Sequence, residues 1–89
     1  MSEVEVQILN RLGLHARAAA KMVHVANEFG CSIMVAKGGS RVDGKSILGL
    51  LTLAASKGTR LTLTAEGDDA EAALEALAAL IRDRFGEEE

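Results

Sequence analysis

The segment Val4–Ala26 has the sequence VEVQILNRLGLHARAAAKMVHVA, and the spacing of its apolar residues changes part-way along. Val4, Val6 and Ile8 alternate with polar residues, which is typical of a strand with one face in water. After a loop over residues 10–13, the apolar residues follow the three- and four-residue spacing of one helical face. This helical stripe consists of Ala19, Met22, Val23 and Ala26, and Gly30 is expected to end the helix after Phe29.

Five further elements follow from the same two spacings. Cys31–Lys37 alternates again, and Gly38-Gly39 favours a tight hairpin turn into Ser40–Asp43. The hydroxyl of Ser46 is placed to cap a short helix that runs to Leu53. Leu61–Ala65 alternates with threonines and predicts a fourth strand.

The last predicted element is a helix. Asp68 and Glu71, three residues apart, have the spacing of a capping box at its start. The helix is expected to continue to about Phe85, and residues 86–89 are expected to form a solvated acidic tail. Its apolar stripe consists of Leu74, Leu77, Leu80 and Ile81.

The expected order of elements is therefore β-α-β-β-α-β-α. Because the strands alternate instead of being apolar throughout, one face of their sheet should be wet, with helices covering the other. We expect one two-layer α+β domain that spans residues 1–89.

The composition excludes several classes of protein. The chain has a single cysteine, so no internal disulfide can form. Its only aromatic residues are two phenylalanines, which are too few to stack on single-stranded nucleic acid. His15, His24 and Cys31 lack the paired spacing of a zinc site, so no metal is expected. No apolar run is long enough to span a bilayer, and the acidic N-terminus is unlike a signal peptide. We expect a cytoplasmic monomer that neither binds nucleic acid nor inserts into a membrane.

Charge is unevenly distributed along the chain. The net charge is −3, but residues 1–60 carry +4 and residues 61–89 carry −7. No acidic residue lies between Val6 and Asn27, where the charged and titratable residues are all basic. A basic segment in an acidic protein indicates an anionic partner that is met at one place. Solvated surface charge explains the same pattern equally well.

His15 lies where the loop becomes the first predicted helix. The first amides of a helix have no internal acceptor, and the helix dipole favours an anion there. A neutral imidazole can act as a nucleophile, so His15 is a candidate phosphoryl acceptor, with the amides of Ala16 and Arg17 and the Arg17 guanidinium beside the phosphate. Taken alone, a single histidine of this kind is more often only a surface residue.

Two motifs favour the interpretation of His15 as a phosphoryl acceptor over that of an ordinary surface residue. Gly13-Leu14-His15-Ala16-Arg17 and Lys45–Leu51, with the sequence KSILGLL, resemble those of HPr, the histidine-containing phosphocarrier family of the bacterial phosphoenolpyruvate:sugar phosphotransferase system. The similarity extends from Val4 to about Arg84. It implies an open-faced β-sandwich, in which three helices cover one side of a four-stranded antiparallel sheet.

The resemblance also implies a function. The residue that matches His15 accepts a phosphoryl group on Nδ1 from phospho-Enzyme I and passes it to the A components of sugar permeases, and the residue that matches Arg17 assists at the phosphate. Such a protein is a phosphorylated intermediate and not an enzyme, and no cofactor is implied. A basic set is expected to attract acidic partners, namely Arg11, Lys21 and Lys45. An apolar set is implied as a docking surface, namely Ile47, Leu48 and Leu51.

Ser46 matches a residue that a dedicated HPr kinase/phosphorylase modifies in many bacteria, although its role as a helix cap alone would explain it. Ala18 replaces the proline that the family usually has after the arginine. Two alternatives therefore stay open. Beside the expected carrier of the sugar system, they are a nitrogen-branch paralogue and a regulatory binding module that acts through Ser46 and Ile47.

Overall fold

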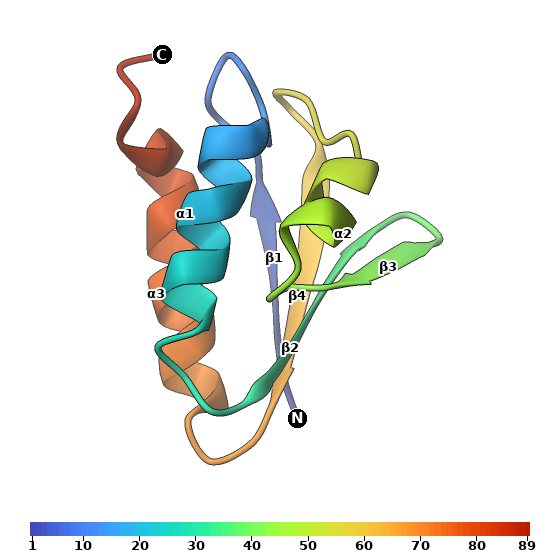
Figure 1. Cartoon of the computed structure of the whole chain (residues 1–89), viewed down its shortest axis with the longest axis vertical. Coiled ribbons are helices and arrows are strands. Elements are labelled where there is room, and N and C mark those ends of the chain that lie inside the picture. Colours follow the sequence, from blue (N-terminus) through green and yellow to red (C-terminus); the bar gives the residue numbers. More distant parts are fainter.

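Four antiparallel strands form one sheet in the order β1-β4-β2-β3, and the helices lie on one side of it (Figure 1). The computed structural model describes residues 1–89. This arrangement confirms the expected α+β class and the order of the elements. The elements are β1 (Ser2–Gln7), α1 (Ala16–Ala26), β2 (Ser32–Lys37), β3 (Ser40–Asp43), α2 (Ile47–Thr52), β4 (Arg60–Glu66), α3 (Ala70–Arg82) and the short 3₁₀ turn η1 (Arg84–Gly86).

Alternation along the strands separates a dry face of the sheet from a wet one. β4 lies between β1 and β2, with Val6 opposite Leu61 and Val35 opposite Leu63. These four side chains are buried, whereas their neighbours along each strand are at least partly exposed. The uncovered face carries polar residues such as Glu5 and remains in water, as the alternation predicted.

Helices α1 and α3 cover the dry face side by side, and alanines make up much of their buried surface (Figure 1). Small side chains let the two helices lie close to each other, while larger side chains fill the space above the sheet. The predicted apolar stripes are confirmed, because Met22, Leu77 and Ile81 are fully buried. Phe85, just beyond α3, is also fully buried and closes one end of the core.

The predicted limits of α1 and α3 were partly wrong. α1 ends at Ala26 with Asn27 as its C-cap, three residues before Gly30. The capping box of Asp68 and Glu71 does not form, since Asp69 is the N-cap and makes no side-chain cap bond. α3 ends at Arg82, three residues before the predicted end at Phe85.

Asp69 instead joins the start of α3 to the turn before β2. One carboxylate oxygen accepts the N–H of Gly30 at 2.8 Å and the other accepts the N–H of Cys31 at 3.0 Å. The bond from Gly30 is the main cause that lowers the pKa of Asp69 below its ordinary value of 3.8. Burial raises the pKa of the Cys31 thiol, and the Asp69 carboxylate raises it further.

The C-terminal residues are not a solvated tail as expected. The chain turns at Phe85 and Gly86, both of which have positive φ, and then runs back toward the loop before α1 (Figure 1). The Glu87 side chain is only 18% exposed, and Arg11 forms an ion pair with Glu89 at 3.3 Å. No helix in the structure is both long and apolar enough to cross a membrane.

Asp69→Ala should lower the Tm because the N–H groups of Gly30 and Cys31 lose their acceptor. The contribution of the ionised Asp69 to the stability of the fold is complete above pH 3.8 and is lost as the pH falls through its lowered pKa. The difference in Tm between Asp69→Ala and wild type should therefore narrow in acid. Thermal unfolding followed by circular dichroism from pH 7 to pH 3 measures both effects. Asp68→Ala, at an exposed neighbour, is the matched control, and an equal loss of Tm there would contradict this assignment.

Candidate functional site

His15 is the N-cap of α1. Its backbone is extended, with φ −80° and ψ 179°, and its carbonyl accepts the first helical N–H, from Ala19, at 2.8 Å. The amides of Ala16 and Arg17 therefore have no acceptor within the helix. No acidic residue occupies the first turn, so the positive end of the helix dipole is not neutralised by its own side chains.

Gly13 determines where the loop before His15 can lie. Its φ of +69° is in the left-handed region, and a Cβ there would lie 2.5 Å from the carbonyl oxygen of Ala55. The N–H of Leu14 donates to that same oxygen at 2.8 Å, and the Leu14 side chain is buried. A glycine is thus required for the loop to lie against Ala55 and hold His15 at the start of α1.

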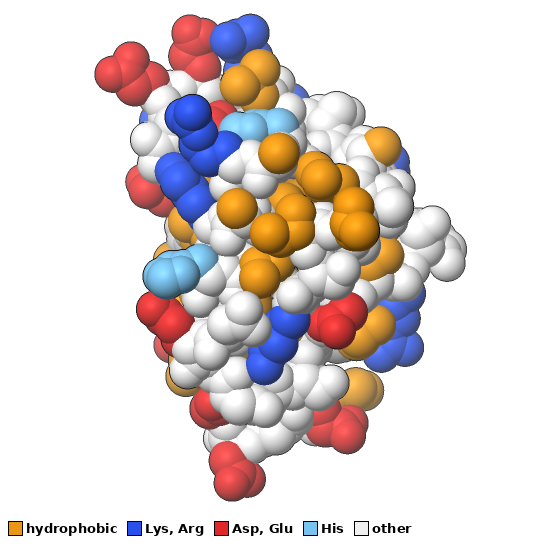
Figure 2. All heavy atoms as spheres, in the orientation of Figure 1, with side chains coloured by type: hydrophobic (Ala, Val, Ile, Leu, Met, Phe, Trp, Pro, Cys, Tyr) orange, Lys and Arg blue, Asp and Glu red, His pale blue; other side chains and the backbone are white.

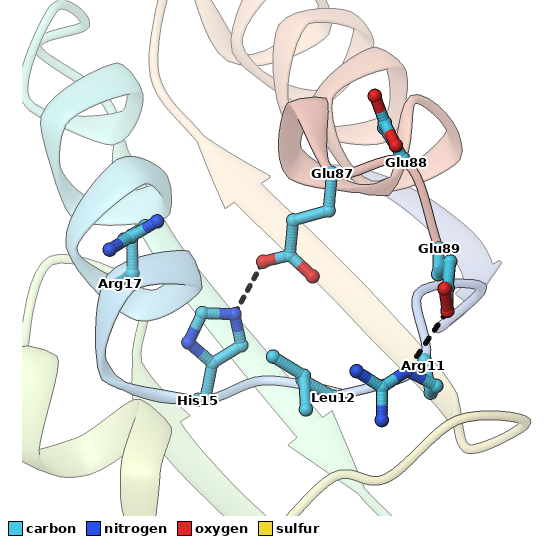
Figure 3. Close-up of a pocket in the computed structure, with 7 residues that line it drawn as sticks. All are labelled: Arg11, Leu12, His15, Arg17, Glu87, Glu88 and Glu89. Carbon is cyan, nitrogen blue, oxygen red and sulfur yellow. Dashed lines mark hydrogen bonds and ion pairs between the residues drawn. The ribbon is translucent and has the colours of Figure 1, made fainter.

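The side chain of His15 is held by Glu87 (Figure 3). Nε2 forms a hydrogen bond with one carboxylate oxygen of Glu87, while Nδ1 makes no hydrogen bond and faces away from Glu87, on the side of α1. The amide nitrogen of the fully buried Asn10 donates to the other Glu87 oxygen at 3.0 Å and to the carbonyl of Gly13 at 2.7 Å. The hydrogen bond from His15, reinforced by that from Asn10, lowers the pKa of Glu87 below its ordinary value of 4.5.

A surface depression of about 460 Å³ opens beside His15. The exposed Arg17 lies at its edge and forms no ion pair, so its guanidinium is free to meet an anion. The depression is lined by Arg11, Leu12, His15, Arg17, Glu87, Glu88 and Glu89 (Figure 3).

Ser46 is the N-cap of α2, as predicted. Its hydroxyl oxygen accepts the N–H of Gly49 at 3.0 Å. The helix exposes apolar side chains next to this cap, with Leu48 77% and Ile47 42% exposed and Leu51 half-buried. Figure 2 shows the apolar surface over α2 and the neighbouring part of α1.

The lysines of the predicted basic set bond within the chain. The Nζ of Lys21 donates to the carbonyl of Phe85 at 2.5 Å, and the Nζ of Lys45 donates to the carbonyl of Phe29 at 2.7 Å. Phe85 lies three residues after the end of α3 and Phe29 three residues after the end of α1, so each ammonium holds the chain where it leaves a helix. Both lysines still contribute positive charge to the surface, and these contacts give them a structural role as well.

Sequence reasoning missed Asn10 and Glu87. A buried asparagine in a loop and one glutamate of a GEEE terminus give no periodic signal. The available signal was Phe85, an aromatic residue at the expected end of the last helix, which is buried and brings the chain end back toward α1. The structure contains no group of three His, Cys, Asp or Glu side chains placed to hold a metal ion.

The geometry around His15 agrees with the comparison to known proteins. A family model described as the PTS HPr component phosphorylation site matches residues 2–83. The chain belongs to the HPr family of phosphocarrier proteins. This membership confirms the resemblance that the two sequence motifs indicated.

Individual HPr proteins match over the full length of the chain. The phosphocarrier protein HPr of Pseudomonas aeruginosa is 51% identical over 90 residues, with both chains fully covered. The crystal structure of HPr-C-His from Thermoanaerobacter tengcongensis superposes with a TM-score of 0.96 at 47% identity, again over 100% of each chain. The phosphocarrier protein NPr of Shewanella violacea is 45% identical over 96% of this chain and 93% of its own.

His15→Ala should raise the pKa of Glu87 toward 4.5, because the hydrogen bond that contributes most to lowering it is removed. In the wild-type chain this bond stabilises the fold above pH 4.5, and its contribution is lost as the pH falls through the lowered pKa of Glu87. A carbon-13 NMR titration of the Glu87 carboxyl measures the change. His24→Ala, which removes an exposed histidine of the same helix, is the control and should leave the titration unchanged.

Ser46→Ala should lower the free energy of unfolding by about 1 kcal/mol, because the N–H of Gly49 loses its cap. Urea unfolding monitored by circular dichroism measures the loss. Ser56→Ala, in the exposed loop before β4, should change stability by less than half of that amount. Equal losses in the two variants would mean that the hydroxyl of Ser46 does not act as a cap.

Proposed function

We propose that this HPr-family chain carries a phosphoryl group on Nδ1 of His15, accepting it from phospho-Enzyme I and passing it to the A components of sugar permeases. The observation that carries the proposal is the position of His15 at the N-cap of α1, with Nδ1 free of any hydrogen bond. Exposure supports it as well, since 27% of the His15 side chain is accessible to a partner.

The start of α1 suits a phosphoryl group bound to His15. The amides of Ala16 and Arg17 are unsatisfied, and the dipole of an 11-residue helix adds partial positive charge. The Arg17 side chain, which has no internal partner, supplies a guanidinium for the phosphoryl oxygens. Ala18 in place of the usual proline is buried and helical, so the first turn keeps its form without the ring.

Partner docking is proposed at the surface that surrounds His15. The apolar side chains of Ile47, Leu48 and Leu51 offer contact area, and the positive charges of Arg11, Lys21 and Lys45 lie in the same half of the chain. This combination suits an acidic partner with an apolar centre. Association should accordingly weaken as the salt concentration rises.

Incubation with phosphoenolpyruvate, magnesium and bacterial Enzyme I should add one phosphoryl group to the wild-type chain, detected by intact mass. The adduct should be lost in acid and persist in alkali, as expected of phosphorus bonded to an imidazole nitrogen. His15→Ala should accept nothing. His24→Ala should be modified like wild type, because its side chain lies on the exposed face of α1 away from the cap.

Two results would contradict the proposal. Modification of His15→Ala at another histidine would move the site, and an acid-stable adduct would mean that the acceptor is not an imidazole nitrogen. If the general Enzyme I gives no adduct, a nitrogen-branch Enzyme I is the next donor, since an NPr is among the relatives.

A regulatory binding module is the second candidate function, favoured by the high exposure of Leu48 beside the Ser46 cap. Phosphorylation of Ser46 by an HPr kinase/phosphorylase would add a charge of roughly −1.5 to −2 next to this apolar surface. The added charge would repel an acidic partner and favour a basic one. A partner that is retained only by the Ser46-phosphorylated chain, and equally by its His15→Ala variant, would support this function over phosphotransfer.

A further inference from the structure

Glu87 reaches His15 across 72 residues of sequence, and its two carboxylate oxygens serve two different donors (Figure 3). One oxygen faces Nε2 of His15 and the other accepts from the amide of Asn10. These contacts make a continuous chain of side chains from the buried loop to Nε2 of the imidazole. The neighbouring carboxylates take no part in it, because Glu88 is exposed and Glu89 pairs with Arg11.

The direction of the Asn10 amide follows from its neighbours. Its Nδ2 lies within hydrogen-bond distance of the Gly13 carbonyl and of Glu87, both of which are acceptors. The amide oxygen, Oδ1, is buried and has no partner, and turning the amide over would set it against those same acceptors. Asn10 is thus fixed as a donor, and it holds Glu87 in place from within the protein.

The same reasoning shows which ring nitrogen of His15 carries the proton. The bond from Asn10 and the lowered pKa of Glu87 keep that carboxyl ionised at neutral pH, so both of its oxygens are acceptors only. Nε2 of His15 must then carry a proton in order to donate. In the neutral ring the lone pair consequently lies on Nδ1, on the side of α1 (Figure 3).

We propose that Asn10 and Glu87 are positioning residues for phosphoryl transfer: Asn10 holds Glu87, and Glu87 keeps the proton of His15 on Nε2 and the lone pair on Nδ1. This proposal rests on the proposed function and deepens it. In this proposal the C-terminal segment orients the His15 ring. A carboxylate orients the imidazole in the same way in other histidine sites.

The transfer step balances with this proton arrangement. The lone pair of Nδ1 forms a bond to phosphorus while the bond between phosphorus and the donor breaks, and that electron pair stays with the donor. The His15 ring gains one positive charge and keeps its Nε2 proton, which continues to donate to Glu87. When an acceptor atom of the next protein forms its bond to phosphorus, the Nδ1–phosphorus bond breaks, its electron pair returns to Nδ1 and the ring becomes neutral again.

Nitrogen-15 NMR of the unphosphorylated chain at neutral pH tests the proposal before any transfer. Nε2 of His15 should give the shift of a protonated ring nitrogen and Nδ1 that of an unprotonated one. In Glu87→Ala both shifts should move toward those of the exposed His24, which is an internal reference in each spectrum. Glu88→Ala removes the same charge from the adjacent residue and should leave the His15 shifts as in wild type.

Asn10→Ala keeps Glu87 but removes the group that holds it, so its His15 shifts should also move toward those of His24. If this buried substitution unfolds the chain, Glu87→Ala alone decides the question. Phosphoryl acceptance should be about tenfold slower in Glu87→Ala than in Glu88→Ala.

Unchanged His15 shifts in Glu87→Ala would overturn the proposal, as would a wild-type ring that carries protons on both nitrogens or on Nδ1 alone. Failure of the proposed function gives a different result. In that case the wild-type chain accepts no phosphoryl group, while the nitrogen shifts still report whether Glu87 orients the ring.

Discussion

The loop before α1 is anchored to the carbonyl of Ala55, which accepts the N–H of Leu14 and leaves no room for a side chain on Gly13. This contact sets the point at which α1 starts, and with it the direction of the helix dipole and the place of His15. It also brings the Gly13 carbonyl to Asn10, whose amide in turn holds Glu87. One steric constraint thus determines both the start of α1 and the side chain that orients its cap.

Most of the fold could be predicted from the sequence because its elements depend on local spacing. Alternation in Val4–Ile8, the helical stripe around Met22 and the cap at Ser46 each depend on residues within a few positions of one another. The contacts that were missed join distant residues, such as Asp69 with Gly30 and Glu87 with His15. A single polar side chain that binds across the fold has no periodicity, so its partner is defined only when the core has brought the two segments together.

The same distinction explains the part of the candidate site that could be predicted. His15 and Arg17 belong to one short motif, and the helix start explains their chemistry without reference to the rest of the chain. Asn10 and Glu87 are not in that motif, and the acidic terminus suggested solvation instead of a contact. The buried Phe85 directs the chain end toward the motif, because it fixes the turn from which Glu87 extends.

The charges around His15 have opposing effects on a phosphoryl group. The amides and guanidinium on the side of α1 attract its oxygens, whereas the carboxylate of Glu87, at the other ring nitrogen, repels those oxygens while it attracts the positive charge that the ring gains. Such a balance suits a group that is accepted and then passed on, since attraction alone would favour retention. The same arrangement leaves Nδ1 as the nitrogen that reacts and Nε2 as the nitrogen that Glu87 holds.

Phosphorus–nitrogen correlation NMR on the phosphorylated, nitrogen-15-labelled chain tests this account most directly. We expect the phosphorus to be coupled to Nδ1 of His15, with Nε2 still protonated and facing Glu87. Coupling to Nε2 of His15, or to either nitrogen of His24, would contradict the account.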